Sequence, residues 1–322
     1  MDQEQKSVAV VGASGIGKHH AKWWDFEGAR VCGFVGTSSE SVADTQDVLS
    51  DLFGYEGPGY TDLAELLERE HPDIVDVCTP PDCHFEHVLT AIGELKDTLC
   101  EKPFVYDEKS ESEEILDKAK SLVSAADTAG VRLGMCSQYH VSARKCQELL
   151  GQNTDDAEVK KFRGQLASPV RDRAPNPVES WMDLAPHMLA GLQATVPGAT
   201  INFRSLETSF SGYGAKASFT VDASNGTQVE CEIVTNRTLP EKETSHIRRF
   251  ELNGHTYDIG GGKNENGIYC AEIETDWGIF QYPDPLRLLI REFLTGTAVI
   301  DGAEALKNLT WLLRIADYNS QS

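Results

Sequence analysis

The first 140 residues alternate short apolar runs with longer segments of helical spacing. Each run is apolar on both faces, as expected for parallel strands that helices cover on both sides. A helical stretch from Glu111 to Ala129 precedes the last of these runs. The alternation predicts an N-terminal doubly wound parallel sheet of the Rossmann type. The apolar runs lie within residues 8–11, 29–36, 72–81, 97–103 and 130–140.

Beyond about residue 155 the apolar positions recur every second residue. "AKASFTVDASNGTQVECEIVTN" alternates around Asn225-Gly226, a dipeptide suited to the positive-φ positions of a type I′ turn, and a second such segment surrounds Asn253-Gly254. This pattern predicts an open, mainly antiparallel sheet. The outward positions of the first hairpin are too polar for a buried face to be assumed; they are Ser218, Thr220, Asp222, Glu230 and Glu232.

The two patterns predict an α/β domain followed by an α+β domain. We expect a dinucleotide-binding Rossmann domain over residues 1–135 and a substrate-binding and oligomerisation domain over 136–302. Helical spacing returns at the end, and residues 303–322 are expected to form a C-terminal helix that packs back on the Rossmann domain.

The composition argues against nucleic acids and membranes as binding partners. The 322 residues carry a formal charge of −22 with no basic cluster, which opposes binding to nucleic acid or to anionic membranes. No apolar run approaches the roughly 18 to 20 residues of a membrane span, and the N-terminus is too polar for a secretory signal, so we expect a cytoplasmic protein. Eight scattered cysteines without a CxxC pair are expected to be reduced and buried, with no metal site.

A glycine-rich turn, Gly12-Ala13-Ser14-Gly15-Ile16-Gly17, stands between the first apolar run and a helical segment. Glycines there let a pyrophosphate approach the N–H groups of a helix N-terminus. Ser14 occupies the middle glycine position of G-x-G-x-x-G, so the motif alone is weak. Its place in the pattern favours a dinucleotide site that involves Ser14, Gly15 and Ile16.

The second apolar run ends in "FVGTSSES", without the acidic residue that usually accepts from the ribose 2′-OH of NAD. Thr37 and Ser38 offer hydroxyls to a 2′-phosphate, which favours NADP over NAD. The alternative is that these residues only cap the next helix.

Two further segments place polar groups at strand ends. Thr79 and the pair Glu101-Lys102 follow apolar runs, and ligands of doubly wound sheets bind beyond the carboxyl ends of strands. Asp183 and His187 have i, i+4 spacing, which puts both on one face of a helix that Asp183 could also cap, with Pro186 in its first turn. These side chains can therefore address one ligand.

In this order the motifs resemble the Gfo/Idh/MocA family of oxidoreductases, over nearly the whole chain. The shared motifs are a histidine three residues after the glycine turn, a Thr-Pro dipeptide with a later histidine, a Glu-Lys-Pro segment and a D-x-x-x-H pair. Here they are His20, Thr79-Pro80 with His84, Glu101-Lys102-Pro103, and Asp183 with His187.

The resemblance implies hydride transfer between a nicotinamide and a carbinol carbon of a sugar, polyol or related molecule. His187 would be the general base, Lys102 would stabilise the alkoxide, and Asp183 would orient the substrate. It also implies a homodimer or homotetramer. The implied cofactor-binding residues are Gly12, Ser14, Gly15, Ile16, Gly17, Thr37, Ser38, Thr79, Pro80, His84, Glu101 and Lys102; the implied substrate-binding residues are Lys102, Gln138, Tyr139, Asp183 and His187.

Some positions depart from the family pattern. "NPVESWMD" replaces a glycine triplet, and Gln138 and Tyr139 stand near an expected arginine, which leaves the substrate open. Arg171 and Arg173 could bind an anionic substrate or lie in a solvated loop. Two other functions stay open at this point: an NAD-dependent glycosidase that oxidises its sugar transiently, and a non-catalytic dinucleotide sensor.

Overall fold

The computed structural model describes residues 5–155, 157–170, 174–239 and 246–321. Contacts within the chain divide it into two compact units, which are described separately. The first unit comprises Met1–Cys136 and Leu286–Leu306, and the second comprises Ser137–Pro285 and Lys307–Ser322.

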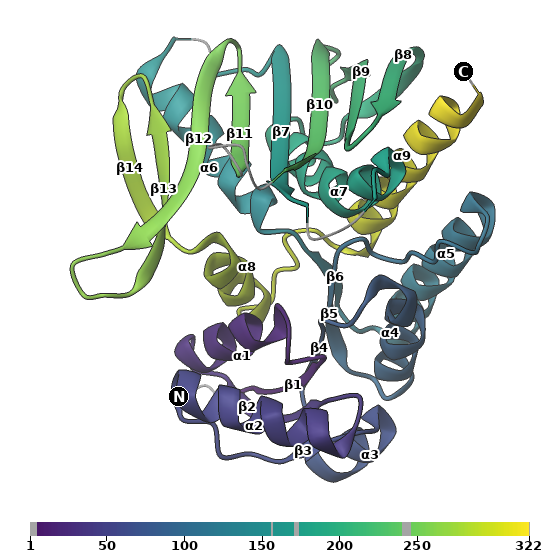
Figure 1. The fold of residues 1–322 in the computed structure, drawn as a ribbon, viewed down its shortest axis with the longest axis vertical. Coiled ribbons are helices and arrows are strands. Elements are labelled where there is room, and N and C mark those ends of the chain that lie inside the picture. The colour runs from purple at the N-terminus through teal and green to yellow at the C-terminus, as the bar shows by residue number, and fades with distance from the viewer. Residues whose placement is uncertain (1–4, 156, 171–173, 240–245, 322) are drawn as a thin grey trace. The chain divides into compact units, whose positions relative to one another are not determined.

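The first unit contains a six-stranded sheet in which all neighbouring strands are parallel (Figure 1). The order is β3-β2-β1-β4-β5-β6, which confirms the predicted doubly wound Rossmann topology. At the β6 edge, Met135 N–H donates to the carbonyl of Ile300 at 2.8 Å, so a returning segment covers that edge. The strands are β1 (Ser7–Val11), β2 (Arg30–Val35), β3 (Gly59–Tyr60), β4 (Ile74–Val77), β5 (Asp97–Glu101) and β6 (Leu133–Cys136).

The helices of this unit form two groups. One group contains α1 and α2, which contact each other, and the other contains α3, α4 and α5. Trp23 and Trp24 of α1 are buried. The helices are α1 (Gly17–Phe26), α2 (Ser39–Phe53), α3 (Leu63–Glu70), the short η1 (Pro81–Cys83), α4 (His84–Gly93), α5 (Ser112–Ala129) and α8 (Pro285–Leu294).

The second unit contains an eight-stranded sheet in the order β14-β13-β12-β11-β7-β10-β9-β8 (Figure 1). Only the central β7–β10 pair is parallel among these neighbours, which confirms the mainly antiparallel prediction. The strands are β7 (Lys161–Pro169), β8 (Thr200–Ser211), β9 (Gly214–Asp222), β10 (Gln228–Thr238), β11 (Ile247–Leu252), β12 (His255–Lys263), β13 (Tyr269–Thr275) and β14 (Gly278–Pro283).

Helices α6 (Gln138–Asn153) and α7 (Pro177–Thr195) cover one face of this sheet (Figure 1). Inward residues such as Phe219, Ile233 and Phe250 are buried on that side. The opposite face carries the polar positions that we expected to be outward, because β9 and β10 pair Ser218 with Glu232 across from α7.

The C-terminal helix α9 (Gly302–Gln321) differs from its expected placement. From Lys307 onward it belongs to the second unit, and residues 286–306 are the part that groups with the Rossmann unit. Trp181 donates to the carbonyl of Leu312 at 3.0 Å, and Asn308 donates to the carbonyl of Pro186 at 3.1 Å. These bonds, together with the buried Leu309 and Leu312, explain why α9 packs on α7.

Two local predictions were wrong: positive φ at both residues of Asn225-Gly226, and the capping of a helix by Asp183. At Asn225-Gly226 only Gly226 has positive φ, because the turn closes from Gly226 N–H to the Ala223 carbonyl and Asn225 instead accepts from Thr227 N–H. The second hairpin has positive φ at both Asn253 and Gly254, as predicted.

Asp183 does not cap its helix. Asn176 is the N-cap of α7, since its Oδ1 accepts from Glu179 N–H at 3.0 Å, and Pro186 lies inside the helix rather than in its first turn. Across the described residues, the helices are all too short or too polar to cross a membrane.

Candidate functional site

The glycine turn is held tightly against the segment that follows β4. Gly12 has φ +87°, and a Cβ there would lie 2.9 Å from the Cys78 carbonyl oxygen and 3.1 Å from Thr79 Cγ2. A Cβ on Gly17 would lie 2.5 Å from the Gly12 carbonyl oxygen. Glycine is therefore required at both positions, and the turn meets Thr79 at the carboxyl edge of the sheet.

The N-terminus of α1 suits an anionic ligand. It has neither a side-chain cap nor an acidic residue in its first turn, and Ser14, Gly15 and Ile16 of the preceding turn are exposed. A positive helix end with an open glycine-rich approach fits the pyrophosphate of a dinucleotide.

The "TSSES" segment lies at the end of β2. Ser38 is the N-cap of α2, with Oγ accepting from Ser41 N–H at 3.2 Å, so the capping interpretation is confirmed. Thr37 and Ser38 are both exposed, and Glu40 lies in the first turn of α2. The segment can thus cap a helix while presenting hydroxyls to solvent.

His84 connects two of the predicted motifs to each other. Its side chain is fully buried, with Nδ1 2.9 Å from the Pro103 carbonyl and Nε2 2.8 Å from the Thr79 carbonyl. Burial lowers the pKa of His84, although both carbonyl contacts favour the cation. Pro80 is exposed beside it. Sequence analysis placed His84 among the cofactor-binding residues, whereas its ring nitrogens hold backbone groups.

Glu101 and Lys102 end β5 at the same edge. The Lys102–Pro103 peptide is cis, and Glu101 Oε2 accepts the backbone N–H of Lys102 at 3.2 Å. The other oxygen, Oε1, lies 3.2 Å from His20 Nε2. The Glu101 carboxylate therefore links the backbone of Lys102 to the helix that follows the glycine turn.

His20 forms the centre of a buried polar cluster. Its Nδ1 lies 2.8 Å from Asp76 Oδ2, the same oxygen that accepts from Trp24 Nε1 at 2.6 Å. The side chains of His20 and Asp76 are both 0% exposed. These contacts bring α1, β4 and β5 together beneath the glycine turn.

Two cysteines complete the surroundings of His20. Cys78 Sγ lies 3.5 Å from Asp76 Oδ1, and Cys136 Sγ lies 3.9 Å from His20 Nε2. Burial raises the pKa of Cys136 to about 12 and that of Cys78 well above its usual value, so both are neutral thiols. Two sets have ligand atoms within 4.8 Å of one another, a juxtaposition that the sequence spacing did not indicate: His20-Asp76-Cys78 and His20-Glu101-Cys136.

In the second unit, α7 presents Asp183 and His187. Asp183 accepts a hydrogen bond from Arg237 of β10, whose other nitrogen donates to Ser168 Oγ at 3.1 Å. His187 Nδ1 lies 3.0 Å from the Oγ of the buried Ser137, which directly precedes α6. Each predicted side chain therefore has a partner that fixes its orientation.

Gln138 and Tyr139, which follow β6, differ in burial. Tyr139 is buried, with its ring 4.8 Å from that of His187 and 6.4 Å from that of Phe250, and burial raises its pKa to about 12. Gln138 is partly exposed. Tyr139 thus packs behind His187, while Gln138 is the more accessible of the two. Arg171 and Arg173 lie outside the described residues.

Sequence analysis missed Asp76, Arg237 and Ser137. Asp76 is the one charged residue of the apolar strand "IVDV", and Arg237 occupies an inward position of an alternating strand. A buried charge needs a partner, so both residues gave a signal. Ser137 gave none, because its partner lies 50 positions away.

Residues 6–136 match the model of the Gfo/Idh/MocA oxidoreductase family with an NAD-binding Rossmann fold. The first unit is therefore similar to this family over residues 6–136, as the motifs indicated. It is similar to the glucose-6-phosphate 3-dehydrogenase of Bacillus subtilis, with 27% identity over 135 residues, 42% of this chain and 34% of the relative. The match thus spans about a third of that relative's length.

Solved structures of similar fold extend over nearly the whole chain. A UDP-N-acetylglucosamine 3-dehydrogenase from Acidithiobacillus ferrooxidans is 19% identical with a TM-score of 0.71, covering 97% of each chain. A scyllo-inositol dehydrogenase from Lactobacillus casei, solved with NAD(H) and scyllo-inositol, is 11% identical with a TM-score of 0.70, covering 98% of this chain and 96% of its own. At these identities the likeness concerns the fold.

Proposed function

We propose that this protein is an NAD(P)-dependent oxidoreductase that transfers a hydride to or from a carbinol carbon of a sugar or polyol. The observation that carries the proposal is the placement of Lys102 at the carboxyl edge of the parallel sheet, where the glycine turn also lies. The match of residues 6–136 to the model of the Gfo/Idh/MocA oxidoreductase family supports it. A nicotinamide cofactor, when bound, supplies or accepts the hydride.

The roles proposed for the residues follow from their chemistry. His187 takes the hydroxyl proton at Nε2, a role supported if Nδ1–H donates to Ser137 Oγ and leaves the lone pair on the other nitrogen. Lys102 stabilises the negative oxygen, and Asp183, oriented by Arg237, binds a neighbouring hydroxyl. Gln138 contributes a further polar contact, and Tyr139 supports the ring of His187.

The cofactor half of the site uses the glycine turn, with Gly12 and Gly17 shaping it and residues 14–16 approaching the phosphates. Thr37 and Ser38 favour NADP over NAD, because no carboxylate at the end of β2 repels a 2′-phosphate. Calorimetric titration with NADPH and NADH in parallel tests this preference. We expect NADPH to bind about tenfold more tightly, equal to about 1.4 kcal/mol; tighter NADH binding contradicts the preference, and failure of both to bind contradicts the function.

The substrate class is supported by the names of the similar proteins, which are dehydrogenases of glucose 6-phosphate, UDP-N-acetylglucosamine and scyllo-inositol. A screen of sugars, sugar phosphates, nucleotide sugars and polyols with NADP+ and NAD+ should give reduced cofactor. Lys102→Ala should lower turnover by about a hundredfold or more and leave cofactor affinity within a few fold. Equal turnover by both proteins excludes the proposed role of Lys102.

His187→Ala provides the matching test in the second unit. We expect a similar loss of turnover together with loss of the acidic limb of the pH–rate profile, since that limb reports protonation of the base. Ser137→Ala should preserve the limb but lower turnover by a smaller factor. A variant at His187 that keeps an unchanged profile contradicts its assignment as base.

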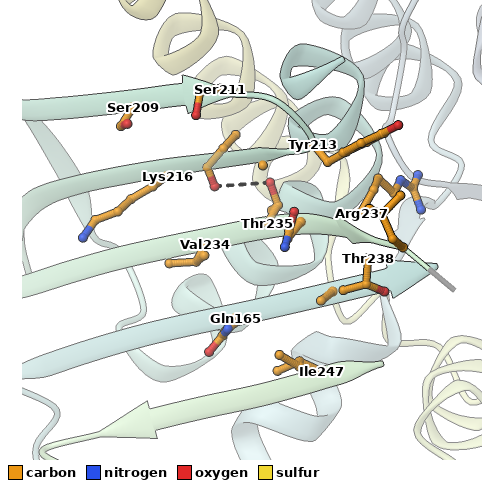
Figure 2. A pocket seen from close by; sticks show the side chains of 15 residues that line it. Gln165, Ser209, Ser211, Tyr213, Lys216, Val234, Thr235, Arg237, Thr238 and Ile247 are labelled. Atoms are coloured by element: carbon orange, nitrogen blue, oxygen red, sulfur yellow. Dashed lines mark hydrogen bonds between the residues drawn. The ribbon is translucent and has the colours of Figure 1, made fainter. Parts of the chain in front are cut away.

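We also propose that a second copy of the chain covers the open face of the eight-stranded sheet. A hollow of about 430 Å³ lies there. In Figure 2, Val234 and Ile247 lie among polar side chains such as Gln165 and Lys216. Sedimentation should give a dimer or tetramer that Val234→Asp weakens; a monomer at all concentrations excludes it.

All eight cysteines are free thiols, which suits a reducing compartment such as the cytoplasm.

A further inference from the structure

The buried cluster of His20, Asp76 and Glu101 has a hydrogen-bond arrangement that determines where protons lie. Ionised carboxylates accept hydrogen bonds but cannot donate them. Asp76 Oδ2 faces His20 Nδ1 at 2.8 Å, and Glu101 Oε1 faces His20 Nε2 at 3.2 Å. With both carboxylates ionised, both ring nitrogens carry hydrogen, and His20 is a buried imidazolium between them.

The surroundings of His20 are consistent with a cation. Burial is the largest single effect and opposes the charge, but attraction to and hydrogen bonding with Asp76, together with the contributions of Cys78 and Cys136, raise the pKa of His20 well above its usual value. The other titratable groups that face the ring are Cys78 from the end of β4 and Cys136 from β6, both neutral thiols. Trp24 donates to Asp76 from the next turn of α1 and fixes that carboxylate.

The position of Glu101 connects this cation to the proposed catalytic lysine. One carboxylate oxygen faces His20, and the other accepts the backbone N–H of Lys102 at 3.2 Å. Glu101 has only 13% of its side chain exposed, so few water molecules can replace a lost partner. The direction of the chain at Lys102 thus depends on a carboxylate that His20 holds.

We propose that His20 is a positioning residue that fixes the Glu101 carboxylate and, through it, the backbone of Lys102 beside the glycine turn. The expected effect on turnover rests on the proposed function, whereas the positioning of Glu101 and Lys102 by His20 does not. Because His20 also belongs to the helix that follows the glycine turn, the same contact joins the expected cofactor-binding turn to the lysine segment.

Two substitutions separate the contacts of His20. An asparagine amide can reproduce the donor at Nδ1 but not the one at Nε2, and a glutamine amide can reproduce the donor at Nε2 but not the one at Nδ1. His20→Asn should therefore keep Asp76 and lose Glu101, while His20→Gln should keep Glu101. Both remove the positive charge and one hydrogen bond, so a purely structural role predicts equal effects. His71→Asn, at an exposed histidine that ends α3 with φ 47°, is the matched control.

Three measurements follow on the same proteins. Backbone hydrogen exchange at Lys102 should accelerate roughly tenfold in His20→Asn relative to His20→Gln and wild type, since that amide loses a fixed acceptor. Turnover should fall roughly tenfold or more in His20→Asn, with cofactor affinity within a few fold, and less in His20→Gln. Nitrogen-15 NMR of the wild-type imidazole ring should show both nitrogens protonated near pH 7.

The outcomes are separable. Equal Lys102 exchange and equal turnover in the two His20 variants overturn the proposal, as does a ring nitrogen without hydrogen or a stoichiometric metal ion bound there in the purified protein. If wild type turns over no substrate, the proposed function fails, while the exchange and NMR measurements still decide the role of His20. An effect of His71→Asn as large as that of His20→Asn also overturns it.

Discussion

The core of the first unit and the open sheet face of the second unit hold ion pairs in different environments. In the first, His20 and Asp76 are 0% exposed, and Glu27 at the end of α1 has 9% of its side chain exposed against Arg287 and Arg291. In the second, Arg163 and Glu232 lie on the open face of the sheet with side-chain exposures of 38% and 27%. Similar chemical groups therefore interact mainly through protein in this core and largely through water on this sheet face.

This difference determines what each pair contributes. A buried charge that loses its partner keeps its desolvation cost, whereas an exposed charge is hydrated when its partner leaves. The exposed groups also have more than one partner, so the loss of one leaves another in place. Arg163 donates to both Glu232 and Glu251 at 2.7 Å, and Glu232 also pairs with Lys216. The buried cluster should be sensitive to single substitutions, and the exposed face should tolerate them.

The largest loss of stability is expected for Asp76→Ala. It leaves His20 Nδ1–H and Trp24 Nε1–H without an acceptor in the core, and the expected cost is about 4 kcal/mol in the free energy of unfolding of the first unit. Urea unfolding followed by tryptophan fluorescence measures it. Asp76→Asn keeps the shape and one acceptor, so its smaller loss separates charge from packing. A loss below about 1 kcal/mol for the alanine variant contradicts the comparison.

Glu27→Gln should have the next largest effect, about 2 kcal/mol, because charge-assisted bonds from Arg287 and Arg291 are lost. Burial opposes the Glu27 charge, but the two arginines outweigh it and lower the pKa of Glu27 below its ordinary value of 4.5. Its stabilisation is therefore complete above that value and is lost as pH falls through the lower folded-state pKa. The difference between wild type and Glu27→Gln should shrink over that acidic range and stay constant from pH 6 to 8.

Periodicity predicted the architecture of both units because each pattern reports which faces are covered. The runs around Val8 and Val75 are apolar on both sides, and helices cover the parallel sheet. The alternation through Ser218 and Glu232 correctly indicated an outer polar face. The turn at Asn225 and the start of α7 were predicted incorrectly, since Asn225 and Asn176 use their side chains to bind backbone N–H groups that spacing cannot identify.

The candidate site was predictable only where residues of one motif act together. Glu101 and Lys102 are adjacent, and Asp183 and His187 lie one helical turn apart, so the sequence placed each pair correctly as neighbours. The partners of these residues come from distant strands: Asp76 lies 56 positions from His20, and Arg237 lies 54 positions from Asp183. Such pairings depend on strand order and register, which a single sequence does not specify.

A smaller effect is expected for Arg163→Ala on the open face, about 1 kcal/mol. The variant removes contacts to Glu232 and Glu251, but Lys216 remains beside Glu232 and water reaches all of these groups. Raising the salt concentration to about 1 M should reduce the difference from wild type, because screening weakens exposed pairs much more than buried ones. Asp76→Ala provides the control, and its loss should change little with salt.

The smallest effect is expected for Lys161→Ala, which removes the pair with Glu230 at 3.0 Å on the same sheet face. Both side chains are more than two-thirds exposed, at 68% and 69%, so hydration should offset the lost attraction and leave stability within about 0.3 kcal/mol of wild type. Measurement at two protein concentrations sharpens the comparison, because a dimer couples stability to concentration. A loss above about 1 kcal/mol that grows with dilution means that a second copy buries this pair, and the contrast between the units then holds only for the isolated chain.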